Sequence, residues 1–277
     1  MRVVVNVRLI YRELNSIQMA RRGEKEYQKW DYSLHIEKHK RKVIKMNILS
    51  KVNIIKLRKN YGEIDDVINT KEYREFRSEE EAEAWGKERY GKWAKQYKEI
   101  FKLTSKYDNK LLHVVEPADM YLGYKYIEMN GVLREEAAYD SVSKEIAGYI
   151  GNLMMAIFSA PVIGEKVILY RLVPKLMVEE LVFHNKKGRP YVEKGFLSTS
   201  MVKECCEKHC GSSNYMLKIY VDDETPIHAM FANAIRVRSE EELLLPPKMY
   251  MRMVKYPYVD EVTGKIVYEV RLINMVW

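Results

Sequence analysis

The hydrophobic periodicity of this chain changes once, at Pro161, and this change limits the folds that the chain can adopt. Before Pro161, apolar and aromatic residues recur at the spacing of a helical face. After it, short runs rich in β-branched and aromatic residues predict strands at 167–173, 195–200, 215–221, 242–245, 249–257 and 266–273. Helices followed by strands indicate an α+β fold with an antiparallel sheet, because βαβ units would interleave the two.

Three helices are predicted before Pro161. The first begins where Ser78 is followed by Glu81, since this spacing is that of a capping box. Its aromatic face, which we interpret as core, comprises Tyr90, Trp93, Tyr97 and Phe101. The second spans residues 118–134, and the third ends at Ala160-Pro161. Near the C-terminus, Thr263-Gly264-Lys265 predicts that the last two strands form a hairpin.

The positive charge of the chain is concentrated in residues 1–75, to which we assign no fold. The formal net charge is +8, and all of this excess lies in that segment, most densely at Lys38-His39-Lys40-Arg41-Lys42. One interpretation is a solvated basic arm. The other is a surface for an acidic partner, such as nucleic acid, an anionic membrane or an acidic protein. We therefore expect a basic N-terminal segment, 1–75, and a separate domain, 76–277.

No transmembrane segment or signal peptide is predicted. No stretch reaches the roughly 18 uncharged apolar residues of a membrane span. Residues 1–10 are apolar, but they contain Arg2 and Arg8 and no small-residue cleavage site follows. We expect the protein to stay in the cytoplasm that made it or to leave by a route that the sequence does not show.

The three cysteines, Cys205, Cys206 and Cys210, form one cluster with His209. An odd, clustered set is not a disulfide framework. A zinc site would need a second pair of ligands at a fitting spacing, and the sequence shows none. We expect reduced, partly buried thiols on a helix and no metal site.

Three segments of the strand-rich half carry polar side chains suited to one chemistry. Arg171, at the end of an apolar run, can hold a diphosphate, although a strand-end surface charge is the alternative. Ser198-Thr199-Ser200 can buttress a carboxylate. Glu240-Glu241-Glu242 would usually be a solvated acidic run, but it continues directly into Leu243-Leu244-Leu245-Pro246. Glu242 therefore enters a buried strand and needs polar partners, and alternation along a strand puts Glu240 on the same side.

These side chains suit the cleavage of NAD at its glycosidic bond and the transfer of ADP-ribose to an acceptor. The bond breaks dissociatively, so a preorganised carboxylate can stabilise the cationic sugar, and paired carboxylates serve comparable transition states in glycosidases. No GxGxxG motif is present, so a Rossmann site is not the way in which this chain would bind a dinucleotide.

Two further motifs accompany the three segments. Trp85-Gly86 is followed by Tyr90 and Trp93, and residues 121–134 contain Tyr121, Gly123, Tyr126, Asn130, Leu133 and Arg134 at a regular spacing. In order over residues 76 to about 275, the five motifs resemble those of the arginine-specific ADP-ribosyltransferase exoenzymes of binary and insecticidal toxins. The resemblance implies an α+β domain with N-terminal helices packed on a two-sheet, mainly antiparallel β core. It also implies NAD as a substrate and no metal.

The resemblance further implies a role for each site residue. Glu242 would bond the ribose hydroxyl and stabilise the positive charge as nicotinamide leaves, held by Ser198, and Glu240 would orient or deprotonate a target guanidinium. Arg171 would hold the NAD phosphates, and the backbone of Leu172, where the family often has a second arginine, would bond the nicotinamide amide. The other residues expected at the NAD site are Tyr121, Tyr126, Asn130, Phe196, Thr199 and Ser200. Phe196 could equally fill the core.

A glutamate at position 240 implies an arginine acceptor on a target protein, such as actin or another host protein. The expected agent is a monomeric toxin, effector or phage factor, secreted, injected or cytoplasmic, that acts in the cytoplasm of a target cell. The basic loop Ile235-Arg236-Val237-Arg238 indicates a substrate with an acidic neighbourhood. Two alternatives stay open: an NAD glycohydrolase that uses water as acceptor, and an inactive interaction module that keeps the fold.

Overall fold

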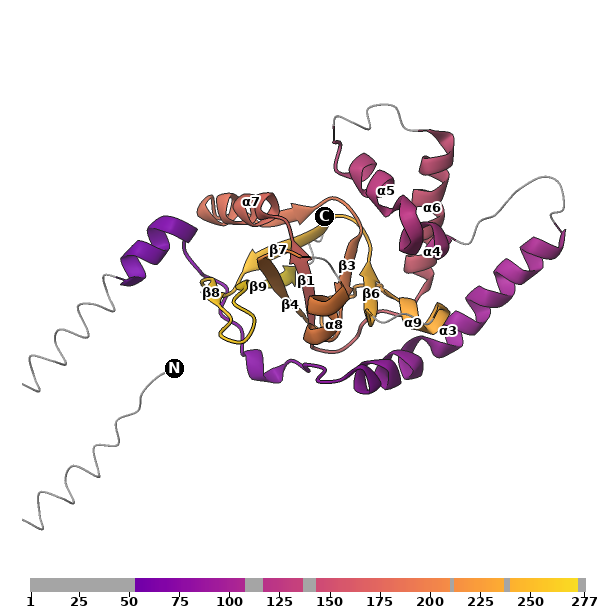
Figure 1. The fold of residues 1–277 in the computed structure, drawn as a ribbon, viewed down its shortest axis with the longest axis horizontal. Coiled ribbons are helices and arrows are strands. Elements are labelled where there is room, and N and C mark those ends of the chain that lie inside the picture. The colour runs from indigo at the N-terminus through magenta and orange to yellow at the C-terminus, as the bar shows by residue number, and fades with distance from the viewer. Residues whose placement is uncertain (1–52, 108–116, 137–142, 210–211, 237–239, 274–277) are drawn as a thin grey trace, which may run out of the picture. The chain divides into compact units, whose positions relative to one another are not determined.

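The computed structural model describes residues 53–107, 117–136, 143–209, 212–236 and 240–273 (Figure 1). The chain divides into two compact units, Met1–Lys56 and Leu57–Trp277. The elements from η1 (Thr70–Glu72) onward belong to the second unit. Several sequence predictions fall outside the described residues, namely those on the basic run 38–42, on Cys210 and on residues 237–238 of the basic loop.

Helix α3 (Glu79–Tyr107) begins where the capping box predicts. The Ser78 hydroxyl accepts a hydrogen bond from the backbone N of Glu81 at 3.3 Å, and the Glu81 carboxylate accepts one from the backbone N of Arg77 at 3.1 Å. Such bonds satisfy N–H groups that have no partner inside the helix. The predicted aromatic core face is confirmed by the burial of Tyr90, Trp93 and Tyr97. The side chain of Phe101 lies outside the described residues.

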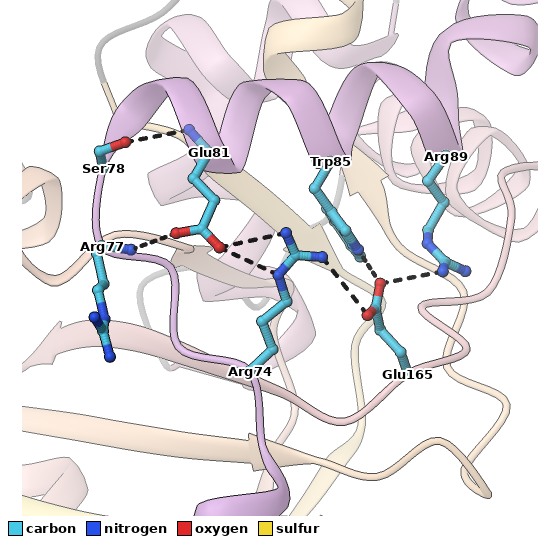
Figure 2. Close-up of polar contacts among 7 residues, drawn as sticks. All are labelled: Arg74, Arg77, Ser78, Glu81, Trp85, Arg89 and Glu165. Atoms are coloured by element: carbon cyan, nitrogen blue, oxygen red, sulfur yellow. Dashed lines mark hydrogen bonds and ion pairs between the residues drawn. The ribbon is translucent and has the colours of Figure 1, made fainter.

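A polar cluster joins the start of α3 to the segment that leads into the sheet (Figure 2). Glu165 accepts hydrogen bonds from the indole N–H of Trp85 and from the Arg89 guanidinium, the latter at 3.2 Å. Arg74 lies between two carboxylates, 3.3 Å from that of Glu81 and 3.9 Å from that of Glu165. These charges are partly exposed, so each ion pair stabilises the fold little by itself. Together they fix the start of α3 against the segment before β1.

The second and third predicted helices are confirmed. Helix α4 (Pro117–Met120), the π-helical turn η2 (Tyr121–Lys125) and α5 (Tyr126–Leu133) follow one another without a break. Helix α6 (Lys144–Ser159) is capped by Ser143, whose hydroxyl accepts from the backbone N of Ile146 at 3.2 Å, and it packs beside α4 and α5 (Figure 1). None of the described helices has the length and the apolar composition needed to cross a membrane.

Nine strands follow the first helices in the part of the chain that the structure describes. They are β1 (Val167–Val173), β2 (Tyr191–Glu193), β3 (Leu197–Ser200), β4 (Tyr215–Val221), β5 (Met230–Phe231), β6 (Glu242–Leu245), β7 (Met249–Met253), β8 (Tyr258–Val259) and β9 (Ile266–Ile273). Their order is β2-β7-β9-β4-β1-β3-β6-β5, with β8 paired to β9. Among the described strands every pair is antiparallel except β4–β9. The predicted α+β class with a mainly antiparallel sheet is therefore confirmed.

The strands form one hydrogen-bonded path. At the middle of this path, β1 and β3 are paired at a single position within the described residues, Tyr170 opposite Ser200. On one side of this link lie β4, β9, β7 and β2, and on the other lie β6 and β5. The predicted site residues Arg171, Ser198 and Glu242 lie next to this link, on β1, β3 and β6.

Two predicted strands are shorter than expected. Strand β3 begins at Leu197 because the backbone N–H groups of Gly195 and Phe196 donate to the side chains of Glu193 and Asn130 rather than to a strand. Strand β7 ends at Met253, before the expected end at Pro257. The predicted hairpin is confirmed, since β7 pairs antiparallel with β9.

Among the described residues, three helices lie between the strands: α7 (Lys175–Lys186), α8 (Lys203–His209) and α9 (Ala232–Ile235). Of these, the sequence predicts only α8, as a helix with reduced cysteines. Cys205 and Cys206 lie on α8, as predicted, and both side chains are buried. Burial raises the pKa of the Cys205 thiol to about 12, so this side chain is an unreactive part of the core.

Helix α3 lies against the strands that lead into the predicted site. A Cβ atom added at Gly86 would be 2.1 Å from the ring of Phe231, a fully buried residue of β5. Strand β5 pairs with β6, which is buried along its whole length. The glycine therefore permits the close approach of α3 to the sheet.

We expect Gly86→Ala to lower the free energy of unfolding by about 2 kcal/mol, because overpacking a dense core typically costs about 1–3 kcal/mol. Gly91→Ala, in the same helix, is the matched control, because a Cβ there has no neighbour within 4 Å. This control should be stabilised by about 0.5–1 kcal/mol through helix propensity. Denaturant unfolding measures both changes, and equal effects at the two glycines would contradict the packing described.

Candidate active site

The pairing of β3 with β6 brings together the predicted hydroxyl and carboxylate. Ser200 lies opposite Glu242, so Ser198 is its diagonal neighbour on the same face. The Ser198 hydroxyl donates a hydrogen bond of 2.5 Å to Oε1 of Glu242, whose exposed fraction is 3%. A buried carboxylate that is oriented in this way has a fixed direction and little water around it. Both features strengthen its interaction with a positive charge that develops beside it.

The next two hydroxyls of β3 hold the backbone around this carboxylate. Thr199 Oγ1 donates to the carbonyl of Leu243 at 2.6 Å, and Ser200 Oγ is 2.7 Å from the carbonyl of Glu240. Both side chains are buried. The structure thus places Thr199 and Ser200 at the predicted site, with their hydroxyl hydrogens directed to backbone carbonyls rather than to a ligand. Their predicted contact with NAD stays a prediction.

Arg171 reaches the same site from β1. Its Nη1 donates to the carbonyl of Ser198 at 2.8 Å, while its Nε is buried without a hydrogen-bond partner. A buried guanidinium N–H that lacks an acceptor fits a site for an anionic group, and the planar fork suits a diphosphate. The neighbouring residue Leu172 belongs to the part of β1 beyond the pair Tyr170–Ser200, where no pairing with β3 is found among the described residues. This edge is where the resemblance places the nicotinamide amide.

The π-helical turn and α5 supply the aromatic side of the site. Asn130 Nδ2 donates to the Tyr121 hydroxyl at 3.0 Å, and Asn130 Oδ1 accepts from the backbone N of Phe196 at 2.8 Å. The rings of Tyr121 and Phe196 pack edge to face, with centroids 5.3 Å apart. All three residues are buried, and Phe196, with no exposed surface, fills the core.

Tyr126 differs from these three residues, since it is 46% exposed while its ring lies 6.3 Å from that of Tyr121. Of the four residues predicted on this side, Tyr126 has the surface to contact a ligand directly. Tyr121, Asn130 and Phe196 instead form the wall behind it. The structure therefore brings the four predicted residues together but gives three of them supporting positions.

A buried ion pair that the sequence interpretation does not assign supports the same wall. Arg134 donates to both oxygens of Glu193, at 2.9 and 3.2 Å, and Glu193 is 1% exposed. The Glu193 carboxylate also accepts from the backbone N of Gly195 at 2.8 Å. With Asn130, these groups fix the turn that leads into β3. Arg134 is the last residue of the motif at 121–134, so its place in the motif could have identified it as part of the site. No sequence motif includes Glu193.

The second unassigned residue is Glu241, between the two predicted catalytic carboxylates. Its φ of 45° lies in the left-handed region, so the expected alternation along one strand does not extend back from Glu242. Strand β6 begins at Glu242, and half-buried Glu240 lies in the bend before it. The Glu241 side chain is buried, with Oε1 accepting from Asn233 Nδ2 at 2.7 Å and Oε2 without a hydrogen-bond partner. Burial raises its pKa to about 7, and nearby Glu83 and Glu79 add to the effect.

The site therefore combines an oriented buried carboxylate, a guanidinium with a free N–H and an aromatic wall. This arrangement can hold an anionic ligand and stabilise a cation that forms next to Glu242. In the part of the chain that the structure describes, no cluster of three or more His, Cys, Asp or Glu side chains is placed to bind a metal ion.

The chain belongs to the ADP-ribosyltransferase exoenzyme family, whose model matches residues 82–273. This range includes each residue of the site described above. Membership places the chain among NAD-dependent transferases that carry out ADP-ribosylation. No sequence among curated proteins matches the chain.

Solved structures with a similar fold include ADP-ribosylating toxins. BECa, part of a binary enterotoxin of C. perfringens and crystallised with NADH, has a TM-score of 0.54 and 20% identity. That match covers 73% of this chain and 50% of BECa, so this chain spans half the length of that relative. The C3 exoenzyme of Clostridium limosum has a TM-score of 0.51 and 19% identity, and the match covers 73% of this chain and 98% of the exoenzyme. Plx2a, an ADP-ribosyltransferase toxin of Paenibacillus larvae, has a TM-score of 0.50 and 17% identity, and the match covers 72% of this chain and 99% of Plx2a. At these identities the likeness shows the fold.

We expect Glu241→Gln to stabilise the protein more at pH 8 than at pH 4. The pKa of Glu241 is about 7 in the folded protein and about 4.5 in the unfolded chain. Between these values the folded state binds more protons than the unfolded state, so the stability of the wild type falls as pH rises. The advantage of the variant should therefore grow by up to about 3 kcal/mol over this interval.

Denaturant unfolding of the wild type and the variant at both pH values measures this difference. Glu88→Gln, which alters an exposed glutamate of α3, is the matched control and should show no such trend. A difference between wild type and Glu241→Gln that is the same at both pH values would contradict the burial of an ionisable Glu241.

Proposed function

We propose that this protein is a mono-ADP-ribosyltransferase that cleaves NAD at its nicotinamide–ribose bond and transfers ADP-ribose to an arginine of a target protein. The observation that carries the proposal is the 2.5 Å hydrogen bond from Ser198 to the buried carboxylate of Glu242, next to Arg171. An oriented carboxylate beside an anion-binding guanidinium matches the charges of this substrate, a cationic ribose at one end and a diphosphate at the other.

In this proposal, Arg171 binds the diphosphate through the N–H groups that it does not use for Ser198. Charge-assisted hydrogen bonds of this kind contribute about 1.5–3 kcal/mol each. The backbone at Leu172 binds the nicotinamide amide, and Tyr126 covers the nicotinamide ribose from its exposed position. Glu242 bonds the ribose hydroxyl and stabilises the oxocarbenium ion as nicotinamide leaves. Ser198 keeps this carboxylate in the direction that the transition state requires.

Glu240 is assigned to the acceptor side. It lies in the bend that precedes β6, and its carbonyl is held by Ser200. Its carboxylate orients or deprotonates the guanidinium of the target arginine, and a glutamate at this position is the feature that favours arginine over water. The acceptor is an arginine on a protein with an acidic neighbourhood, and the proposed setting is that of a monomeric toxin or effector in a target cell. We further propose that residues 1–75 bind an acidic partner.

The test is incubation of the purified protein with labelled NAD and a cell lysate, with nicotinamide release and protein labelling measured in parallel. We expect Glu242→Gln to lower both rates by about 10²–10³, because it removes an electrostatic partner of the transition state. Glu240→Gln should abolish labelling while nicotinamide release continues. Glu180→Gln, an exposed glutamate of α7, is the matched control and should behave as the wild type does.

Two results would overturn the proposal in different ways. Nicotinamide release by the wild type without labelling of any protein, in lysates of bacterial and animal cells, would identify an NAD glycohydrolase. NAD left intact in every sample would indicate an inactive module that keeps the fold for interaction.

A further inference from the structure

We propose that Glu241 is a positioning residue, which holds the acceptor-side carboxylate of Glu240 in place through its hydrogen bond to Asn233. This inference rests on the proposed function and extends it to a residue outside the reacting groups. It predicts that the bond controls how ADP-ribose is divided between arginine and water, while the rate of NAD cleavage depends on other contacts.

The backbone at Glu241 turns its side chain away from the course of strand β6. Its φ of 45° is unfavourable for a residue other than glycine, and such strain persists only where surrounding contacts impose it. Two backbone contacts lie on either side of this side chain. The Glu241 carbonyl accepts from the backbone N of Met201 at 3.0 Å, and the Glu240 carbonyl accepts from Ser200 Oγ at 2.7 Å.

The side chain of Glu241 also connects this part of the backbone to α9. Its Oε1 accepts from Asn233 Nδ2 at 2.7 Å, which joins α9 to the residue that follows Glu240. Helix α9 is held by two contacts. Lys98 of α3 donates to the carbonyl of Ala234 at 3.0 Å, and Arg236, directly after α9, forms an ion pair with Asp119 of α4. The hydrogen bond between Asn233 and Glu241 therefore links the residue next to Glu240 to α9 and, through Lys98, to α3.

The charged and titratable groups around Glu241 come from two helices. Glu79, Glu83 and Lys87 face it from α3, and Cys205 faces it from α8. Two of the three charged neighbours are carboxylates, so a neutral amide at position 241 is compatible with this environment. The structure thus supplies a conservative variant, Glu241→Gln, whose side-chain oxygen can still accept from Asn233.

Glu242 is held by separate contacts. Its carboxylate is bonded to Ser198, and its backbone belongs to the β3–β6 pairing. Loss of the Asn233 bond consequently loosens Glu240 and leaves Glu242 in place. Because a misplacement of about 1 Å can cost about 10² in rate, the step that uses Glu240 is the sensitive one.

The experiment measures, for each protein, the rate of ADP-ribose transfer to agmatine, a small guanidinium acceptor, and the rate of NAD hydrolysis without acceptor. The informative variants are Asn233→Ala and the double variant Asn233→Leu/Glu241→Met. The double variant removes both partners, so it leaves no buried polar group unpaired if the single variant fails to fold. We expect the ratio of transfer to hydrolysis to fall by about 10–100-fold in both, with hydrolysis within about threefold of the wild type. Glu241→Gln should keep the wild-type ratio.

The inference is overturned if the ratio is unchanged in both variants, or if transfer and hydrolysis fall in proportion, which is the sign of a merely structural residue. It is also overturned if Glu241→Gln loses transfer as Asn233→Ala does, since then the hydrogen bond is not what matters. Failure of the proposed function is recognised separately in the wild type. A wild-type protein that hydrolyses NAD without transfer, or leaves it intact, removes both the arginine acceptor and this inference.

Discussion

The hydrogen bond between Ser198 and Glu242 is the interaction on which the proposed chemistry depends, and the surrounding structure serves to make it possible. A carboxylate that is 3% exposed is costly to bury unless it is bonded. The antiparallel pairing of β3 with β6 supplies the partner, since it sets Ser198 diagonally across from Glu242. Arg171 adds a second constraint, because its guanidinium is bonded to the carbonyl of Ser198. The Arg171 guanidinium and the Glu242 carboxylate are therefore fixed to the same residue of β3.

The elements around this bond hold β3 and β6 from two sides. On one side, Glu193 accepts from the backbone N of Gly195 and Asn130 accepts from that of Phe196, while Arg134 donates to Glu193. The start of β3 is therefore set by side chains of β2, of α5 and of the residue that follows α5. On the other side, the close packing of α3 at Gly86 covers the partner of β6. Strands β1 and β3 are themselves joined at the single pair Tyr170–Ser200. The geometry of the site thus follows from packing that lies mostly outside it.

The features of the fold that depend on local sequence patterns could be predicted from the sequence. The capping box at Ser78, the apolar periods and the change at Pro161 predict the class and most boundaries, because each depends on residues close together in the chain. The motifs also predict that Ser198 and Glu242 lie together. Supporting contacts such as those of Glu193 and Asn233 could not be predicted, since each joins segments that meet only in the folded chain. The left-handed backbone at Glu241 reverses an expectation based on strand alternation, because a run of three glutamates carries no turn signal.

The most direct test of the central claim is a crystal structure of Glu242→Gln with intact NAD. The variant keeps the size of the side chain and removes its charge, so the substrate should bind without being cleaved. We expect the diphosphate to lie against the Arg171 guanidinium and the nicotinamide ribose to lie next to residue 242 and Ser198. NAD bound at another surface, or in this site with its diphosphate away from Arg171, would contradict the account.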